Sequence, residues 1–314
     1  MRKTLLATTA LIAVGGVSAA NADVSISGGY EASWVSSNIS GGTTTDTING
    51  ENMDFQISFS STLDNGMSIT GQVNTSEAGV EETGATISGD FGTIGLGPLG
   101  ASDGGMSTAV DVTPDEGTAF TAATDFTALP ADENIDDVAI NYTSPSMGGF
   151  KFAVGRGDAG TTETTVYGAS FTTAAAGGSV TIKYANMDTD SATATASVSA
   201  SSIGVVMSVG DATITVAQNT QDTGETVTEA LVGTGAGVTY KVSDSLTLSA
   251  YTASGDDDKS TAYELTDTGV GLSYTITPGM VLHVTHNEQD LKNSSTYTTS
   301  TSSSRTSVNL NLSF

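Results

Sequence analysis

Residues 52–74 read NMDFQISFSSTLDNGMSITGQVN and contain two runs of alternating apolar and polar side chains joined by a short turn. In the first run, 52–60, a Met, two Phe and an Ile share one face, and Asn, Asp, Gln and Ser share the other. The second run, 67–74, alternates in the same way, and Asp64-Asn65-Gly66 separates the two runs. Period-two alternation interrupted by a glycine-containing turn predicts an antiparallel β-hairpin with one apolar face.

The same alternation continues along nearly the whole chain. We expect strands at 24–34, 52–60, 67–74, 84–90, 93–98, 137–144, 150–157, 164–173, 179–187, 197–208, 212–219, 230–242, 245–254, 262–276, 280–288 and 307–314. These segments predict an all-β protein of about sixteen strands, because helical periodicity is nearly absent after residue 22.

The expected connections alternate between short turns and long polar loops. We expect the long loops at 36–51, 75–83, 99–136, 157–163, 188–196, 220–229, 254–261 and 289–304. This rhythm is typical of a transmembrane antiparallel β-barrel, which closes on itself because lipid cannot hydrogen-bond an open sheet edge. About sixteen strands leave an aqueous lumen. An exported β-sandwich, adhesin or β-helix array also alternates, but the regular loop lengths and the terminal Phe314 favour the barrel.

The first 22 residues have the features of a secretory signal peptide. Arg2 and Lys3 precede a short apolar stretch, and Ala20-Asn21-Ala22 is an A-x-A cleavage site. The sequence therefore predicts export, a single barrel domain over 23–314, and a place in the outer membrane of a Gram-negative bacterium. The chain contains no cysteine, so disulfides do not stabilise it.

The chain is strongly acidic, with a formal net charge of −26, and no Lys or Arg lies between Lys3 and Lys151. This distribution argues against nucleic-acid binding, since phosphate contacts need basic side chains. The acid excess predicts either solubility in a high-salt setting or an electrostatic filter for cations.

Residues 95–104, GLGPLGASDG, match the sequence patterns of two enzyme motifs. Gly95-x-Gly97-x-x-Gly100 matches a dinucleotide loop, but Pro98 and the glycines that follow do not open a helix. Gly100-x-Ser102-x-Gly104 matches a hydrolase elbow, but that site needs a histidine base. His283 and His286 lie three residues apart on one expected strand and point to opposite faces. We therefore expect no enzyme activity.

Segment 99–136 is the longest expected loop, and long loops in ordered domains are usually functional. It contains acids and no basic residue. Its acids include Asp103, Asp111, Asp115, Glu116 and Asp125, and two further acids, Glu31 and Asp54, lie on the first two expected strands.

Several stretches resemble the trimeric general porins of alphaproteobacteria, the Rhodobacter-type family. They are VSISGGYEASW at 24–34, LDNGMSITGQV at 63–73, ISGDFGTIGLG at 87–97 and LGASDG at 99–104. The resemblance implies a homotrimer of sixteen-stranded barrels whose third loop folds inward, with 99–136 as the constriction loop. The seven acids named above, five in this loop together with Glu31 and Asp54, are then the ones expected to act at the pore constriction. It also implies trimer contacts on the early strands, where Gly28, Gly71 and Gly89 permit close approach and loop 75–83 reaches a neighbour.

Members of that family commonly carry arginines on the early-strand wall opposite the third loop, whereas this chain has Glu31 and Asp54 there. The remaining candidates for a basic pore wall are Lys151, Lys183 and Lys241 if they face inward, with Arg156 near the outer rim. The alternative for these cations is simple solvation at the surface or mouth.

Together these features predict a water-filled channel for passive diffusion of small hydrophilic solutes and ions, with a preference for cations. A substrate-specific outer-membrane channel and an exported adhesive or structural β-protein are the alternatives. No cofactor is expected apart from a possible structural Ca²⁺ at the four acids Asp132, Glu133, Asp136 and Asp137, or at 256–258. Phe314 resembles the signal read by the outer-membrane assembly machinery, and membrane lipid is the expected surrounding.

Overall fold

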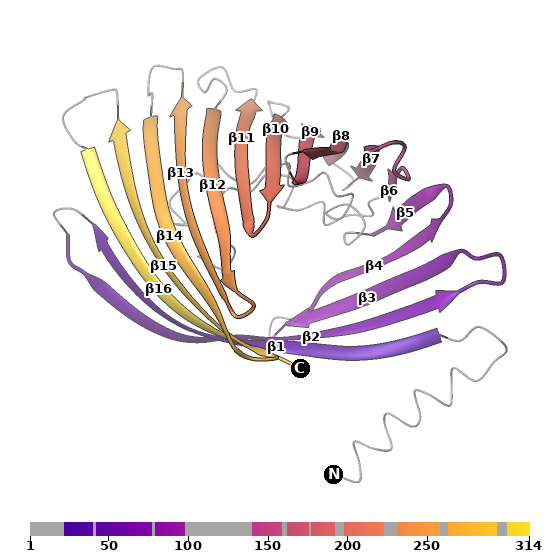
Figure 1. The fold of residues 1–314 in the computed structure, drawn as a ribbon, viewed down its shortest axis with the longest axis horizontal. Helices are drawn as coiled ribbons and strands as arrows, with labels where there is room; N and C mark the ends of the chain where they lie inside the picture. Colours follow the sequence, from indigo (N-terminus) through magenta and orange to yellow (C-terminus); the bar gives the residue numbers. More distant parts are fainter. Residues whose placement is uncertain are drawn as a thin grey trace, which may run out of the picture.

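The computed structural model describes residues 22–39, 42–76, 79–97, 140–158, 162–175, 177–191, 198–222, 231–257, 263–293 and 300–314. These residues form sixteen strands in a closed barrel in which each strand pairs antiparallel with its neighbour in sequence, and β1 pairs with β16 (Figure 1). The predicted fold class, an antiparallel barrel of about sixteen strands, is confirmed. No helix in the described part of the chain is long and apolar enough to cross a membrane.

The strand bounds follow the order of the sequence around the barrel. They are β1 (Ala22–Ile39), β2 (Thr45–Thr62), β3 (Ser68–Ser76), β4 (Gly79–Gly89), β5 (Gly92–Leu96), β6 (Ile140–Thr143), β7 (Phe150–Asp158), β8 (Thr162–Ala175), β9 (Gly178–Ser191), β10 (Val198–Val209), β11 (Ala212–Asp222), β12 (Leu231–Ser243), β13 (Leu246–Asp257), β14 (Tyr263–Thr277), β15 (Met280–Asn293) and β16 (Ser300–Ser313).

The register separates an apolar outer face from a polar inner face. Phe150 on β7 pairs with Phe171 on β8, which pairs with Ile182 on β9. These three side chains are 41%, 43% and 46% exposed, although they are large and apolar. In a closed barrel such exposed rows face lipid, so the alternate rows face the lumen.

Several strands are longer than the alternation predicts, and this is a correction to the expected loops. β1 and β2 are each 18 residues long. Together they cover most of the loop expected at 36–51, and β3 and β4 leave only residues 77 and 78 of the loop expected at 75–83. A tilted strand needs about 9–11 residues to cross the bilayer. Beyond the lipid both faces meet water, so the apolar alternation stops while the backbone pairing continues.

The barrel closes where the last residue meets the first strand. Gly28 donates a backbone hydrogen bond to the Phe314 carbonyl at 3.1 Å, and Phe314 donates one back to the Gly28 carbonyl at 3.0 Å. The Phe314 ring lies over Gly28, where an added Cβ would be 2.6 Å from ring carbon Cζ. It also packs edge-on against Phe55 of β2, with ring centroids 6.1 Å apart. The terminal aromatic side chain is therefore part of the seam.

The glycines expected to admit a neighbouring subunit are covered by aromatic rings of the same chain. A Cβ at Gly71 would be 2.2 Å from the Phe59 ring, and one at Gly89 would be 2.8 Å from the Phe91 ring. Together with Gly28 beneath Phe314, all three positions are occupied by this chain's own side chains. The glycines therefore accommodate phenylalanines of the same chain on the outer face, and a neighbouring subunit at these positions would meet the rings and not bare backbone.

Candidate functional site: the lumen of the barrel

The lumen face of β15 and β16 consists of polar side chains in direct cross-strand pairs. Thr285 pairs with Ser307, and their buried hydroxyl groups are 2.5 Å apart. In the adjacent pairs on the same face, Asn287 lies opposite Arg305 and His283 lies opposite Asn309. Hydroxyl and amide groups of this kind replace bulk water for a passing solute, so this face is suited to an aqueous passage.

Tyr251 of β13 organises a polar network on this wall. Its side chain is only 6% exposed, because the ring lies across Gly269 of β14, where a Cβ would be 2.2 Å from ring carbon Cε1. Asn287 Nδ2 donates to the Tyr251 hydroxyl at 2.6 Å, and that hydroxyl donates to the Asp267 carboxylate at 3.2 Å. The missing side chain at Gly269 thus lets one phenol connect polar groups on two strands.

Charged side chains of both signs lie on the lumen face. Among residues whose side chains the structure describes, the register places four acids there, Asp23, Glu31, Asp54 and Asp267, and four bases, Lys151, Lys183, Lys241 and Arg305. The described part of the wall is therefore balanced in charge, and the overall excess of acid does not come from it.

Two of the predicted basic residues lie in one row near the short-turn end of the barrel. Lys151 pairs with Ser170, and Ser170 pairs with Lys183, so two strand spacings, or about 10 Å, separate the two lysine positions. Lys241 lies at the end of β12, where its ammonium group is 2.9 Å from Asp244 in the following turn. This ammonium group holds the pKa of the Asp244 carboxyl below its usual value by hydrogen bonding and by charge.

Arg156 does not join these lysines, and that part of the prediction is wrong. It lies five residues along β7 from Lys151 and therefore on the opposite, outer face, where it pairs with Ile140 and Thr165. Its guanidinium group is 2.6 Å from the Glu163 carboxylate, and both side chains are more than half exposed. Such an exposed ion pair contributes little to stability.

Three charged lumen residues were missed by the sequence analysis: Asp23, Asp267 and Arg305. Arg305 shares the polar face of β16 with Ser307 and Asn309. The sequence does contain the pattern that predicts this position, because the alternation of 307–314 extends two residues upstream. Arg305 nevertheless borders the polar stretch 289–304, which is typical of a loop. Asp267 likewise falls on the polar face of its expected strand.

Most of the predicted constriction lies outside the described residues. This applies to the five acids of 99–136 named above and to the four-acid calcium candidate, as well as to residues 1–21. In the described ranges no group of three or more His, Cys, Asp or Glu is arranged to hold a metal ion. Glu31 and Asp54 are described. The register pairs Asp54 with Gly29, two positions along β1 from Glu31, so the two acids are diagonal neighbours on the wall.

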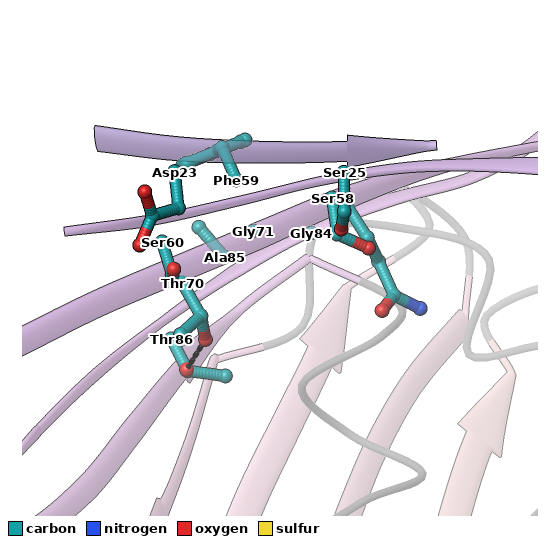
Figure 2. Close-up of a pocket in the computed structure, with 11 residues that line it drawn as sticks. Asp23, Ser25, Ser58, Phe59, Ser60, Thr70, Gly71, Gly84, Ala85 and Thr86 are labelled. Atoms are coloured by element: carbon teal, nitrogen blue, oxygen red, sulfur yellow. Dashed lines mark hydrogen bonds between the residues drawn. The ribbon is translucent and has the colours of Figure 1, made fainter. Parts of the chain in front are cut away.

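A groove on the lumen face crosses β1 to β4 near the turn that joins β2 to β3. We call it the hydroxyl groove. It has a volume of about 390 Å³ and is lined by Asp23, Ser25, Ser58, Phe59, Ser60, Thr70, Gly71, Gln72, Gly84, Ala85 and Thr86. Figure 2 shows Asp23, Ser60, Thr70 and Thr86 in one line, with Ser25 and Ser58 set apart from it.

The register explains the shape of the hydroxyl groove. One wall is the paired row Asp23, Ser60, Thr70 and Thr86, and the other is the row Ser25, Ser58, Gln72 and Gly84. Between the rows lie Phe59, Gly71 and Ala85, whose side-chain direction is outward. The floor between the two polar rows is therefore bare strand backbone.

The sequence matches the family model of Gram-negative porins over residues 7–294. The chain belongs to the Gram-negative porin family. No curated protein sequence is a significant match. The narrower alphaproteobacterial resemblance is not established by these matches.

Solved structures of outer-membrane proteins, two of them porins, share the fold of this porin at low sequence identity. Vibrio cholerae OmpT in its trimer form has 12% identity and a TM-score of 0.66, covering 93% of this chain and 99% of its own. An anion-selective porin from Comamonas acidovorans has 13% identity and a TM-score of 0.65, covering 94% and 100%. A further refined porin structure has 17% identity and a TM-score of 0.65, covering 93% and 100%.

This porin is an integral outer-membrane protein, and its family and barrel are those of a non-enzymatic channel. The prediction that the two histidines face opposite ways is confirmed: His283 pairs with Asn309 on the lumen face, and His286 pairs with Val270 on the outer face. Gly95 of the dinucleotide-like motif lies inside β5, paired with Thr86 and Asn141. It is a wall residue and not part of a phosphate-binding turn.

Proposed function

We propose that this porin is a water-filled channel for passive diffusion of small hydrophilic solutes and ions, with a preference for cations. The observation that carries the proposal is the closed barrel of sixteen strands with a hydroxyl- and amide-lined inner face. A barrel of this size leaves an aqueous lumen. An adhesive or structural β-protein would have no need of a polar interior.

The proposed cation preference depends on segment 99–136, because the described wall carries equal numbers of acids and bases. Its acids would lower the energy of a cation at a narrow passage, joined by Glu31 and Asp54 from β1 and β2. The Debye length is about 8 Å at physiological salt, so only acids close to the passage act as a filter. The fold alone does not decide whether a channel prefers cations or anions, since a protein with this fold is an anion-selective porin.

The remaining features of the proposal concern assembly and processing. We infer a homotrimer, supported by the family resemblance and by the trimer form of a structural relative. Cleavage after Ala22, recognition of Phe314 by the assembly machinery and a Ca²⁺ ion at Asp132, Glu133, Asp136 and Asp137 are part of the same proposal. Unchanged trimer melting after EDTA treatment, with no Ca²⁺ retained on dialysis, would exclude the ion.

We expect purified porin in a planar bilayer to give discrete conductance steps in KCl. Under a KCl gradient, the sign of the reversal potential should show cation preference. Anion selectivity would contradict the role proposed for the acids of 99–136 but would still support the channel function. Folded, inserted protein that never conducts would overturn the channel itself.

Replacing Lys151 and Lys183 together by Gln should raise the cation-to-anion permeability ratio by about three- to fourfold. A unit charge about 8 Å from an ion in water contributes roughly 0.5 kcal/mol, which screening over one Debye length reduces to about 0.2 kcal/mol. Each of the two lysines disfavours a cation and favours an anion, so their removal changes the ratio by about 0.8 kcal/mol. Lys241→Gln is the matched control, because Asp244 already neutralises Lys241 at the turn. Reversal potentials of the three proteins in one KCl gradient provide the measurement. An equal shift in the control would show that the row of Lys151 and Lys183 has no special role.

A further inference from the structure

We propose that the hydroxyl groove is a binding site for neutral, polyhydroxylated solutes of about monosaccharide to disaccharide size on their way through the channel. This rests on the proposed channel function and names a class of solute for it. The groove is on the lumen face of β1 to β4 at the short-turn end, which in such barrels is the periplasmic mouth.

The spacing of the polar rows suits a ligand that carries hydroxyl groups on several sides. Neighbouring strands lie about 5 Å apart, and residues two apart on one strand lie about 7 Å apart. Thr70 and Thr86 therefore face Gln72 and Gly84 across a floor about one sugar ring wide. A compact polyol in the groove can bond to both rows at once.

The chemistry of the lining also favours hydroxyl groups over ions. Each Ser or Thr hydroxyl offers one donor and two acceptor lone pairs. The Thr70 and Thr86 hydroxyls are 2.5 Å apart, so one hydrogen is used between them and the other stays available (Figure 2). A row of groups that both donate and accept matches a solute whose own groups do the same.

The groove carries little net charge. Asp23 is the only ionisable side chain among the described lining residues, and it lies at one end of its row. Cleavage after Ala22, which the sequence predicts, would place the new α-ammonium group on this same residue. The charge left at the groove would then be close to zero, which favours a neutral ligand over a cation.

The size and lining of the groove indicate weak binding. A volume of about 390 Å³ is at the low end of the roughly 300–1,000 Å³ found for small-molecule sites. The one aromatic lining residue, Phe59, turns its ring outward over Gly71 and gives no stacking surface inside. A permeation site must release its solute, so weak binding is what such a site requires.

The test uses purified full-length mature porin in a planar bilayer, with maltose as the probe. A polyethylene glycol of equal hydrodynamic radius controls for volume exclusion. We expect maltose on the short-turn side to reduce the KCl current in a saturable way and the polymer to reduce it only linearly. The double variant Thr70→Val/Thr86→Val should raise the half-saturating maltose concentration by about 3- to 10-fold, as expected for a lost hydrogen bond.

A second hydroxyl pair on the same lumen wall provides the matched control. Thr172 and Thr181 on β8 and β9 are paired in the same way, with hydroxyls 2.9 Å apart, outside the groove. Thr172→Val/Thr181→Val should leave the maltose effect within about twofold of the unmodified porin, since it removes no groove hydroxyl. Ser60→Ala is the smaller change to use if the groove double variant does not fold.

The outcomes separate the site from the channel. Normal KCl steps without a saturable maltose effect would overturn the binding site and leave the channel in place. Equal losses in both double variants would also overturn it. Absence of KCl steps from folded, inserted porin would overturn the channel function, and the solute site with it.

Discussion

Gly149→Ala is expected to destabilise the barrel by about 2–5 kcal/mol and to remove most of the folded form at moderate temperature. Gly149 is the turn residue directly before β7 and has a φ of +92°, and an alanine Cβ there would lie 2.2 Å from the Thr172 carbonyl oxygen. The same Thr172 donates a backbone hydrogen bond to Gly149 at 2.9 Å. The strands cannot separate to admit the methyl group without losing that bond. Left-handed backbone costs a non-glycine residue about 1–2 kcal/mol, and overpacking adds about 1–3 kcal/mol.

Gly148 is the matched control, because it precedes Gly149 in the same turn. It also has positive φ, +64°, but no atom lies within 4 Å of an added Cβ. Gly148→Ala should therefore cost only the backbone term of about 1–2 kcal/mol. The measurement is the temperature at which the folded, fast-migrating form converts to the unfolded form in SDS. Equal losses in the two variants would show that the contact with the Thr172 carbonyl does not matter.

Deleting Phe314 is expected to reduce the folded porin in cells by about tenfold or more. The deletion removes both backbone hydrogen bonds to Gly28 and the ring that packs over Gly28 beside Phe55. Loss of a packed phenylalanine typically costs about 3–5 kcal/mol. The seam between β1 and β16 would then begin with unpaired backbone groups. The measurement is the yield of heat-modifiable trimer from outer membranes.

A second variant separates the seam from a signal read by the assembly machinery. Gly28→Val keeps Phe314 in the sequence but displaces its ring, since a Cβ at Gly28 would be 2.6 Å from that ring. If the seam matters, both variants should also refold poorly from urea into detergent, where no machinery is present. Normal refolding of both in detergent would assign the whole effect to the signal. Unchanged trimer yield in cells after the deletion would contradict both roles.

The strand count and the face of each side chain could be predicted because lipid and water select different side chains on alternate positions. The alternation of 52–60 and 67–74 gave the right hairpin, and Ile57 and Val73 are direct partners in it. The inward direction of Lys151 and of Lys183 also follows from parity alone, whereas their common row depends on the register. The same parity places Arg156 on the outer face, because it lies an odd number of residues, five, from Lys151 on the same strand.

Strand ends and cross-strand contacts could not be read from the alternation. Polar strand tips beyond the bilayer have no apolar face, so β1 and β2 look like loop over much of their outer halves. Arg305 was lost for this reason, since it borders such a polar stretch. The covering of Gly71 by Phe59, and of Gly269 by Tyr251, depends on which residues are opposite across strands. A single sequence shows the glycine and the ring but not their register.

The pairing of β1 with β16 joins the two described strands that lie farthest apart in the sequence. A sheet that lacks β16 keeps two unpaired edges, one on β1 and one on β15. Lipid cannot hydrogen-bond those backbone groups, so the remaining fifteen strands cannot form the same stable structure in the bilayer. A product truncated before residue 300 therefore differs from the closed barrel by two rows of exposed backbone groups, to which another strand can pair.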